Sequence, residues 1–310
     1  MMQIKNILFP TDFSASSEKA FLFADPLVSK FKSRLHILHL ISWHGRGVYS
    51  RSEYGLPISE QNRILKGIEA DARQQISDLF KVDPDYYVQM VEESSKTAAE
   101  GIINYSNEND IDLIVIGSAG GREIYRHLVG GTLEKIIADA PVPVFAVGAD
   151  AQPHQDFTKL LVPVDLSENS DSLLAVAADY AELFGARITI AHVVTPQDTT
   201  VIGGVGLDPM PAMKPVDMTL KREQVNDLAD RVLKGRVEFD VQVVAGHPAL
   251  EIEKMTQDGG CDLVVIASHG YKGFKRLFLG STARHTVHHA SCPVLVMNSN
   301  SLYQADDEGE

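Results

Sequence analysis

Two stretches of the sequence decide the fold, KNILFPTDFSASSEKAFLFADPLVSKFKSRLHILHLI (5–41) and KLLVPVDLSENSDSLLAVAADYAELFGARITIAHVV (159–194). Both contain a lysine, a short apolar strand, a Pro-x-Asp-x-Ser turn, an amphipathic segment and a second apolar strand with a histidine. This order is typical of a βαβ unit in a buried parallel sheet. The shared pattern predicts that the chain contains two copies of one α/β domain.

The similarity returns in the second half of each copy, where DLIVIGSAGGREIYRHLVGGTLEKIIADAPVPVFAV (112–147) aligns without a gap with DLVVIASHGYKGFKRLFLGSTARHTVHHASCPVLVM (262–297). We therefore expect two tandem doubly wound α/β domains, each with a five-stranded, mainly parallel sheet flanked by helices. The strands are expected at 5–10, 35–41, 86–91, 112–117 and 143–147, and again at 159–164, 187–194, 239–244, 262–267 and 293–297. The helices of the first copy are expected at 15–32, 59–80, 96–109 and 130–139.

Composition suggests where the copies begin and end. The segment GADAQPHQDFT (148–158) is polar and lacks periodicity, so it is the expected linker. The acidic end of the chain is expected to be a solvent-facing tail. The predicted organisation is a first domain at 1–147, a linker at 148–158, a second domain at 159–298 and a tail at 299–310.

The charge and cysteine content argue against several classes of protein. The 310 residues include 28 Lys and Arg against 42 Asp and Glu, a formal net charge of −14. Bulk electrostatics therefore does not draw the protein to nucleic acid or to an anionic membrane. The two cysteines, Cys261 and Cys292, fit neither a CxxC nor a zinc-ribbon spacing, and the first residues do not have the pattern of a signal peptide. We expect a cytoplasmic protein without a transmembrane span.

Glycines follow the fourth expected strand of each copy and precede a helix, an arrangement that offers backbone N–H groups and a positive helix end to an anion. The pattern is Gly-x-x-Gly, nine residues, then Gly, with Gly117, Gly120 and Gly130 in the first copy and Ala267, Gly270 and Gly280 in the second. The alternative is that these glycines only cap helices and turn the chain. Neither a P-loop nor a complete dinucleotide fingerprint occurs, and the glycine-containing loop 195–217 is either a binding loop or a surface excursion.

Together, the Asp after the first strand, the G-x-x-G-nine-G-[ST] loop and the ending HASCPVLVM (289–297) resemble the universal stress protein family, as a tandem pair covering nearly the whole chain. The resemblance implies a sheet of strand order 3-2-1-4-5 in each copy. It also implies an adenine nucleotide at the point where the winding reverses, between strands one and four.

The resemblance assigns candidate binding residues in both copies. In the second copy they are Asp165, Val193, Ala267, Gly270, Gly280, Ser281 and Thr282, with Asp165 and Val193 beside the adenine. A weaker site in the first copy would comprise Asp12, Leu40, Gly117, Gly120, Gly130 and Thr132. It is weaker because Gly131 stands where the pattern expects the hydroxyl that Ser281 supplies. The implied cofactor is ATP, with Mg²⁺ as a candidate companion.

Other polar residues have a structural interpretation. Asp12 and Asp165 each precede a serine that could cap the next helix, so a structural role for these carboxylates stays open. His285 and His289 are one turn apart on an expected helix, but no carboxylate or cysteine lies at an obvious chelating spacing, so we predict no metal site. No residue is predicted to be catalytic, because no catalytic triad or carboxylate pair is evident from spacing.

The leading hypothesis is a cytoplasmic stress-response protein that binds ATP or a related adenine nucleotide, mainly in residues 159–298, as a regulatory signal. One alternative is a structural or partner-binding module with decayed nucleotide sites. Another is a weak ATPase with slow hydrolysis at most. The apolar last strands are expected to pair within one chain as an intramolecular pseudo-dimer, with homodimerisation as a further candidate. Neither nucleic acid nor a membrane is an expected partner.

Overall fold

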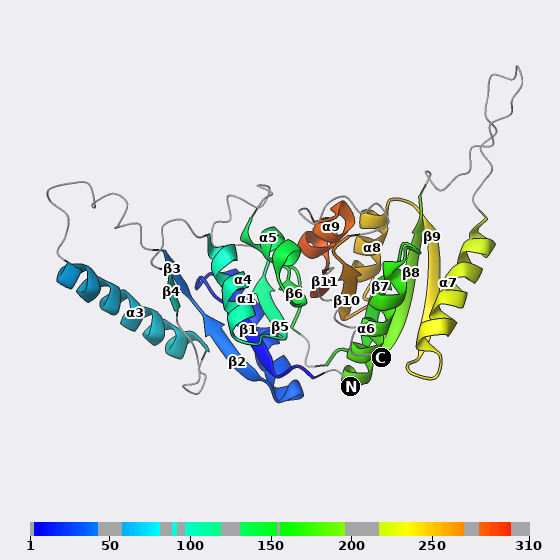
Figure 1. Cartoon of the computed structure of the whole chain (residues 1–310). Coiled ribbons are helices and arrows are strands. Elements are labelled where there is room, and N and C mark those ends of the chain that lie inside the picture. Colours follow the sequence, from blue (N-terminus) through cyan, green and yellow to red (C-terminus); the bar gives the residue numbers. More distant parts are fainter. Residues whose placement is uncertain are drawn as a thin grey trace, which may run out of the picture. The chain divides into compact units, whose positions relative to one another are not determined.

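The computed structural model describes residues 3–42, 58–80, 89–91, 97–118, 131–153, 156–195, 217–269 and 279–298. The chain divides into two compact units, Met1–Ala149 and Asp150–Glu310, which we call unit 1 and unit 2 (Figure 1). The predicted tail and the interior of the loop 195–217 lie outside the described residues, as do three candidate glycines, Gly120, Gly130 and Gly270.

Unit 2 has the strand order that the family resemblance implies. Its elements are β7 (Lys159–Pro163), α6 (Asn169–Phe184), β8 (Arg187–Val194), α7 (Met218–Leu233), β9 (Phe239–Ala245), α8 (Pro248–Gln257), β10 (Leu263–Ala267), α9 (Ser281–His289) and β11 (Val294–Met297). The strands pair in parallel in the order β9-β8-β7-β10-β11. In sequence numbering this is 3-2-1-4-5, so the predicted α/β class and sheet order are confirmed here.

The helices of unit 2 form two pairs, α6 with α7 and α8 with α9. The winding of the sheet reverses between β7 and β10, and right-handed crossovers then place the two pairs on opposite faces. Local sequence sets the helix ends. Gly185 ends α6 in the left-handed region, with φ 69°, and Pro248 begins α8 at a position where no N–H is needed.

Unit 1 has the same architecture in its described residues. Its elements are β1 (Asn6–Pro10), α1 (Ala15–Phe31), β2 (Arg34–Leu38), β3 (Leu40–Ser42), α3 (Ile58–Phe80), β4 (Gln89–Val91), α4 (Ala98–Glu108), β5 (Leu113–Gly117), α5 (Thr132–Asp139) and β6 (Val144–Val147). The main sheet runs β2-β1-β5-β6, and β3 pairs with β4 separately.

The strand expected at 35–41 is thus divided at His39. Its first part pairs with β1 as far as Leu38, and its second part changes partner to β4. In unit 2 the corresponding strand β8 is continuous and pairs with β9 from Ile188 to Val194. The order of the strands is the same in both units.

An equivalent aspartate joins the central strands of each unit. In unit 1, Asp112 Oδ2 accepts the N–H groups of Lys5 and Asn6 at 2.7 and 2.8 Å. In unit 2, Asp262 Oδ2 accepts those of Thr158 and Lys159 at 2.8 and 3.1 Å. These bonds hold the amino end of strand four against strand one, so the carboxyl ends of the same strands meet at the opposite edge.

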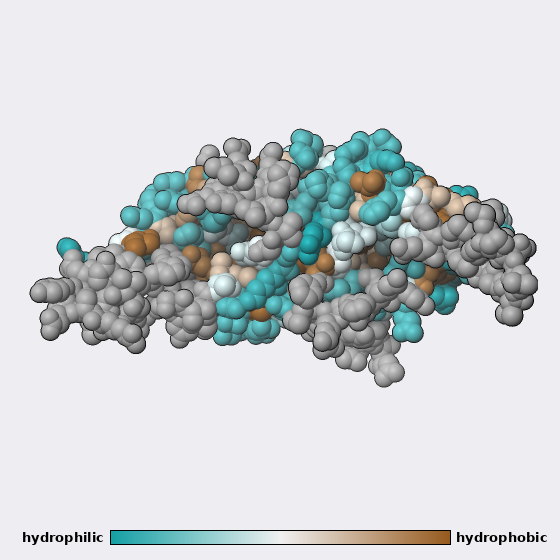
Figure 2. All heavy atoms as spheres, turned by 90° about the horizontal axis from the view of Figure 1, so that it is seen from above, coloured by the Kyte–Doolittle hydropathy of each residue, from teal (hydrophilic) through white to brown (hydrophobic). Residues whose placement is uncertain are grey.

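The described surface is mostly hydrophilic, and Figure 2 shows its apolar residues in small separate groups. Within the described residues, the large apolar side chains that stay exposed come from four helices, α1, α3, α7 and α8: Leu22, Leu79, Met218, Leu220 and Leu250. No helix in the described part of the chain combines the length and the apolar character needed to cross a membrane.

Candidate functional site

The candidate site of unit 2 lies at the carboxyl ends of β7 and β10. These strands are neighbours, with Leu263 opposite Leu160 and Val264 opposite Leu161. Asp165 follows β7, and Ala267 is the last residue of β10. The site is thus at the reversal of winding, where open α/β sheets bind ligands.

The glycine loop returns to the strand that it leaves. The Gly280 N–H donates to the Ser268 carbonyl at 2.9 Å, and the Ser268 N–H donates to the Met297 carbonyl at 2.8 Å. A Cβ on Gly280 would lie 3.0 Å from the Ser268 oxygen, closer than nearly all real contacts of this kind. Glycine therefore favours this approach, because a Cβ would force the Ser268 carbonyl to shift by a few tenths of an ångström. The approach brings the start of α9 against the end of β10.

The helix α9 presents an uncapped amino terminus at this point. Gly280 is its N-cap residue and, lacking a side chain, leaves the first N–H groups of the helix without a side-chain acceptor. Ser281 is exposed and Thr282 is half-buried. No acidic residue occurs in the first turn. The backbone N–H groups and the two hydroxyls can therefore donate to an anion, whose charge the helix dipole favours.

The corresponding helix of unit 1 differs in charge. Its N-cap, Gly131, also makes no side-chain hydrogen bond, but Glu134 lies in its first turn. The gapless alignment places Arg284 of α9 at the position of Glu134. The carboxylate would repel an anion at α5, whereas the guanidinium would attract one at α9. Sequence reasoning missed this charge reversal, although the alignment already contained it.

The candidate aspartates hold tight turns at the carboxyl ends of strand one. Asp12 Oδ1 accepts the Ser14 N–H at 3.0 Å, and Asp165 Oδ1 accepts the Ser167 N–H at 3.1 Å. The residue after each aspartate has a positive φ, 60° for Phe13 and 58° for Leu166. Non-glycine residues rarely adopt this conformation, and such residues cluster at functional sites. Both carboxylates are exposed, so the turn presents them at the edge of the sheet.

Of the two serines that follow the candidate aspartates, Ser14 and Ser167, only Ser14 caps a helix. Ser14 is the N-cap of α1, and its hydroxyl accepts the Ser17 N–H at 3.3 Å. In unit 2 the N-cap of α6 is Glu168, which makes no side-chain cap. The alternative that the aspartate and serine only shape the start of the next helix therefore fits unit 1 better than unit 2.

A histidine from strand two fixes the residue before each aspartate. His39 Nδ1 donates to the Thr11 carbonyl at 2.8 Å, and His192 Nδ1 donates to the Val164 carbonyl at 2.9 Å. A carbonyl can only accept, so Nδ1 carries the proton in both rings. His192 is 5% exposed, and the next candidate residue, Val193, is also buried. His192 is therefore a packed strand histidine that positions the turn.

Gly117 packs closely against a helix. A Cβ there would lie 2.6 Å from the backbone oxygen of Ser16 in α1. Its counterpart Ala267 has the same place at the end of its strand, but α6 begins one aligned residue later, at Asn169.

The remaining candidates of unit 1 lie at the corresponding edge. Leu40, at the start of β3, is half-buried, and Thr132 is the first residue of α5. Asp12 and Gly117 complete the described part of this set. The structure thus places Asp12, Leu40, Gly117 and Thr132 in unit 1, and Asp165, Val193, Ala267, Gly280, Ser281 and Thr282 in unit 2, at the carboxyl ends of their sheets.

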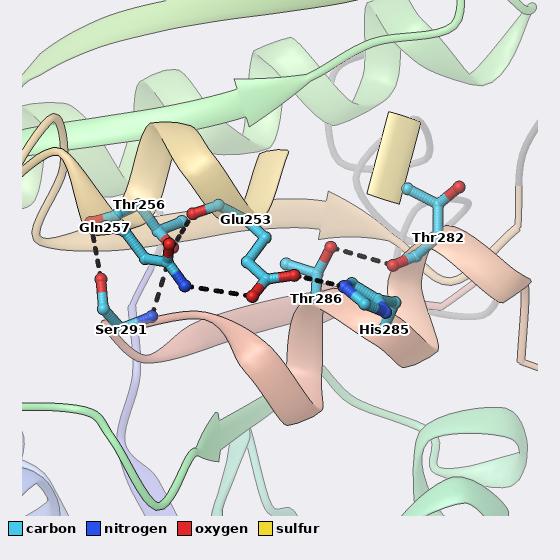
Figure 3. A network of polar contacts seen from close by, with 7 residues as sticks. All are labelled: Glu253, Thr256, Gln257, Thr282, His285, Thr286 and Ser291. Atoms are coloured by element: carbon cyan, nitrogen blue, oxygen red, sulfur yellow. Dashed lines mark hydrogen bonds and ion pairs between the residues drawn. The ribbon is translucent and has the colours of Figure 1, made fainter. Parts of the chain in front are cut away.

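Side-chain bonds brace α9 against α8, as Figure 3 shows. His285 Nε2 lies 2.6 Å from Glu253 Oε2, and Gln257 Nε2 donates to Glu253 Oε1 at 3.0 Å. At the other end of α9, Ser291 bonds Thr256 through its N–H at 3.2 Å and through its hydroxyl at 2.6 Å. The bond from His285 lowers the pKa of Glu253. These contacts fix the axis of the helix whose amino end faces the site.

Unit 1 braces its last helix at the same position. Lys135, the counterpart of His285, donates from Nζ to Glu100 Oε1 of α4 at 2.6 Å. This bond is the main cause of the lowered pKa of Glu100. A nitrogen-bearing side chain one turn into the last helix thus contacts a carboxylate of the preceding helix in both repeats.

No group of three or more His, Cys, Asp or Glu side chains within the described ranges is placed to hold a metal ion. His285 and His289 lie close, with ring centroids 4.3 Å apart. His285 Nε2, however, is engaged by Glu253.

The fold agrees with the comparisons with known proteins. The family model described as Universal stress protein family matches residues 3–148 and 156–298, and the chain therefore belongs to this family. Because both copies match, the chain is a tandem member.

Two relatives illustrate the sequence similarity. The universal stress protein Slr1230 of Synechocystis is 24% identical over 94% of this chain and 99% of its own length. The universal stress protein Rv2005c of Mycobacterium tuberculosis is 28% identical over 61% of this chain. The match spans 62% of the length of the mycobacterial relative.

Two solved structures have the same fold along nearly the whole chain. A universal stress protein from Archaeoglobus fulgidus has a TM-score of 0.58 at 20% identity, covering 96% of this chain and 97% of its own. A universal stress protein described as putative, from Pseudomonas aeruginosa, has a TM-score of 0.60 at 15% identity, covering 98% and 97%. At these identities the likeness concerns the fold.

Proposed function

We propose that the chain is a stress-response protein of the cytoplasm whose unit 2 binds ATP or a related adenine nucleotide as a regulatory signal. The observation that carries the proposal is the hydrogen bond from Gly280 to Ser268, which brings the uncapped start of α9 to the end of β10. The phosphates would accept the N–H groups and hydroxyls of Ser281 and Thr282. Asp165, at the end of the neighbouring strand, would contact the nucleoside.

Charge supports unit 2 over unit 1 as the main site. At physiological pH the phosphates of ATP carry several negative charges, which Arg284 would attract and Glu134 would repel. Ser281 also supplies a hydroxyl that Gly131 lacks. Mg²⁺ would enter with the nucleotide and be held mainly by its phosphate oxygens, as is usual for this ion.

Binding rather than efficient turnover is the activity that these residues favour. The hydrogen-bond donors of the site can hold phosphates, and the candidate carboxylate at this edge, Asp165, already accepts a backbone N–H in its own turn. A weak ATPase remains the enzyme alternative. Phosphate release that persists through repurification and disappears in the Gly280→Ala variant would favour it.

Isothermal titration of the full chain with ATP and Mg²⁺ tests the proposal, with cyclic AMP as a competing adenine nucleotide. Gly280→Ala should weaken binding because the new methyl pushes the Ser268 carbonyl away. Gly131→Ala is the matched control, since a Cβ there meets nothing within 4 Å. No detectable heat at millimolar ATP would support the alternative of a partner-binding module with decayed sites.

We also propose that the last strands β6 and β11 pair within one chain, as the expected pseudo-dimer requires. Exposed apolar edge strands favour association, and pairing them inside the chain removes that hazard. Hydrogen exchange tests this directly. Protection of every amide in Val144–Val147 and Val294–Met297 is expected, whereas fast exchange of alternate amides would indicate an open edge.

A further inference from the structure

The two cysteines of the chain lie in contact inside unit 2. Cys261 precedes β10 and Cys292 precedes β11, and their sulfur atoms are 3.5 Å apart. The strands are parallel neighbours, with Val264 opposite Val294. Both thiols are free, and the residues are only 7% and 2% exposed. Neighbouring strands lie about 4.8 Å apart, a separation compatible with a disulfide between residues one position out of register.

Packing alone does not call for sulfur at these two positions. The gapless alignment places Ile111 and Val142 of unit 1 where unit 2 has Cys261 and Cys292. Both hydrocarbon side chains are buried, at 4% and 8% exposure. The same place in the fold is therefore filled without cysteine in the first repeat. The sulfur pair gives unit 2 a chemistry that its repeat lacks.

The surroundings of the pair set its reactivity. Contact with Cys261, burial and the charge of the neighbouring Asp262 all raise the pKa of Cys292. Asp262 is held in place by the N–H groups of Thr158 and Lys159, so its charge stays next to the thiols. The thiolate is the reactive form, so oxidation should be slow at neutral pH and faster at higher pH. Cys261 is the more exposed of the two and the expected first target.

We propose that Cys261 and Cys292 are a modification site, at which a hydroperoxide oxidises the pair to a reversible disulfide that joins the amino ends of β10 and β11. The Cys261 thiolate attacks one peroxide oxygen, the O–O bond breaks, and a sulfenic acid and hydroxide form. The Cys292 sulfur then attacks the sulfenic sulfur, the S–O bond breaks, and its thiol proton leaves with the hydroxide as water. Two thiols and one hydrogen peroxide thus become one disulfide and two waters.

The disulfide would stabilise unit 2 by restricting its unfolded chain. It closes the segment 261–292, which contains α9 and the glycine loop. Cross-links that close segments of this length raise the apparent melting temperature Tm, here by roughly 5–10 °C. The pair lies at the amino end of β10 and the proposed nucleotide site at its carboxyl end, so either proposal can fail without the other.

The experiment treats the full chain with hydrogen peroxide at pH 7 and pH 8.5. Free thiols are then blocked under denaturing conditions, disulfides are reduced, and the released thiols receive a second label for mass spectrometry. We expect both cysteines to carry the second label, a monomeric chain, faster reaction at pH 8.5, and a rise in Tm that dithiothreitol reverses. Thiols that stay fully blockable, sulfinic acid at Cys261, or a disulfide between chains would each overturn the proposal.

Two kinds of variant make the result specific. Cys261→Ser and Cys292→Ser each remove one partner, and the double variant Cys261→Ile with Cys292→Val copies the pair of unit 1. None should gain stability on oxidation, and the same rise in Tm in any of them would contradict the disulfide. If a variant does not fold, the double labelling of the wild-type chain still decides the question.

Discussion

The backbone N–H of Gly280 donates to the carbonyl of Ser268 at 2.9 Å, so the two ends of the glycine loop in unit 2 meet at the end of β10. The bond places the first residue of α9, Ser281, at the edge of the sheet where Asp165 follows β7. From the sequence alone, the glycine spacing of this loop could indicate either a simple turn or a phosphate site. In the structure the loop makes a close backbone contact that directs the amino end of α9 toward this edge.

Ser281 and Gly131 are aligned at the start of the last helix of each unit, and exchanging them should shift nucleotide affinity from unit 2 to unit 1. Ser281→Gly removes a hydroxyl donor worth roughly 0.5–1.5 kcal/mol, a loss of about two- to tenfold in ATP affinity. Gly131→Ser adds the same donor to unit 1. Titration calorimetry of both variants should show weaker binding only in the first. Equal affinity in Ser281→Gly and wild type would remove this hydroxyl from the site.

The glycine that faces α1 should matter for stability. In Gly117→Ala the new methyl would meet the Ser16 carbonyl oxygen at 2.6 Å, so unfolding of unit 1 should become easier by roughly 1–3 kcal/mol. Urea unfolding measures the change. The reciprocal Ala267→Gly in unit 2 should cost only about 0.5–1 kcal/mol, because it adds flexibility without relieving a clash. An unchanged midpoint for Gly117→Ala would mean that α1 does not pack as described.

The bond between Glu253 and His285 should make stability depend on pH. Its effect is to lower the pKa of Glu253 below the ordinary value of 4.5 in the folded state. The contribution is therefore present above about pH 4.5 and is lost as the pH falls through the lower folded-state pKa. Glu253→Gln should be less stable than wild type at pH 7, and the difference should shrink in acid.

Chemical denaturation between pH 3 and pH 7 measures this difference. Glu238→Gln, at an exposed position ahead of β9, is the control and should follow the wild-type pH curve. A Glu253→Gln stability deficit that stays constant over the whole range would show that the carboxylate does not titrate with a lowered pKa.

Local pattern was sufficient for the α/β class and the two copies, because strands and helices have distinct periods and the repeat supplies each twice. The strand order that unit 2 has was implied by the family resemblance and not by the periodicity. The division of the second strand at His39 was not predictable, since it reflects a change of pairing partner from β1 to β4 that the local sequence does not contain.

The site was predictable in outline, and its contacts were not. The spacing of the glycines identified Gly280 and Ser281 as candidates. It gives no information on the close packing of Gly117 against Ser16 of α1. The contact between Glu253 and His285 joins side chains of two helices. Periodicity describes each helix by itself and carries no information on such a contact.

The central claim is that unit 2 holds the nucleotide at the amino end of α9. The most direct measurement is the ATP affinity of the full chain with Arg284→Glu, which copies the charge of Glu134, beside Glu134→Arg as the reciprocal variant. Arg284→Glu should lose about tenfold or more in ATP affinity and much less in adenosine affinity, because the phosphates carry the charge. Unchanged ATP binding in Arg284→Glu would contradict the claim.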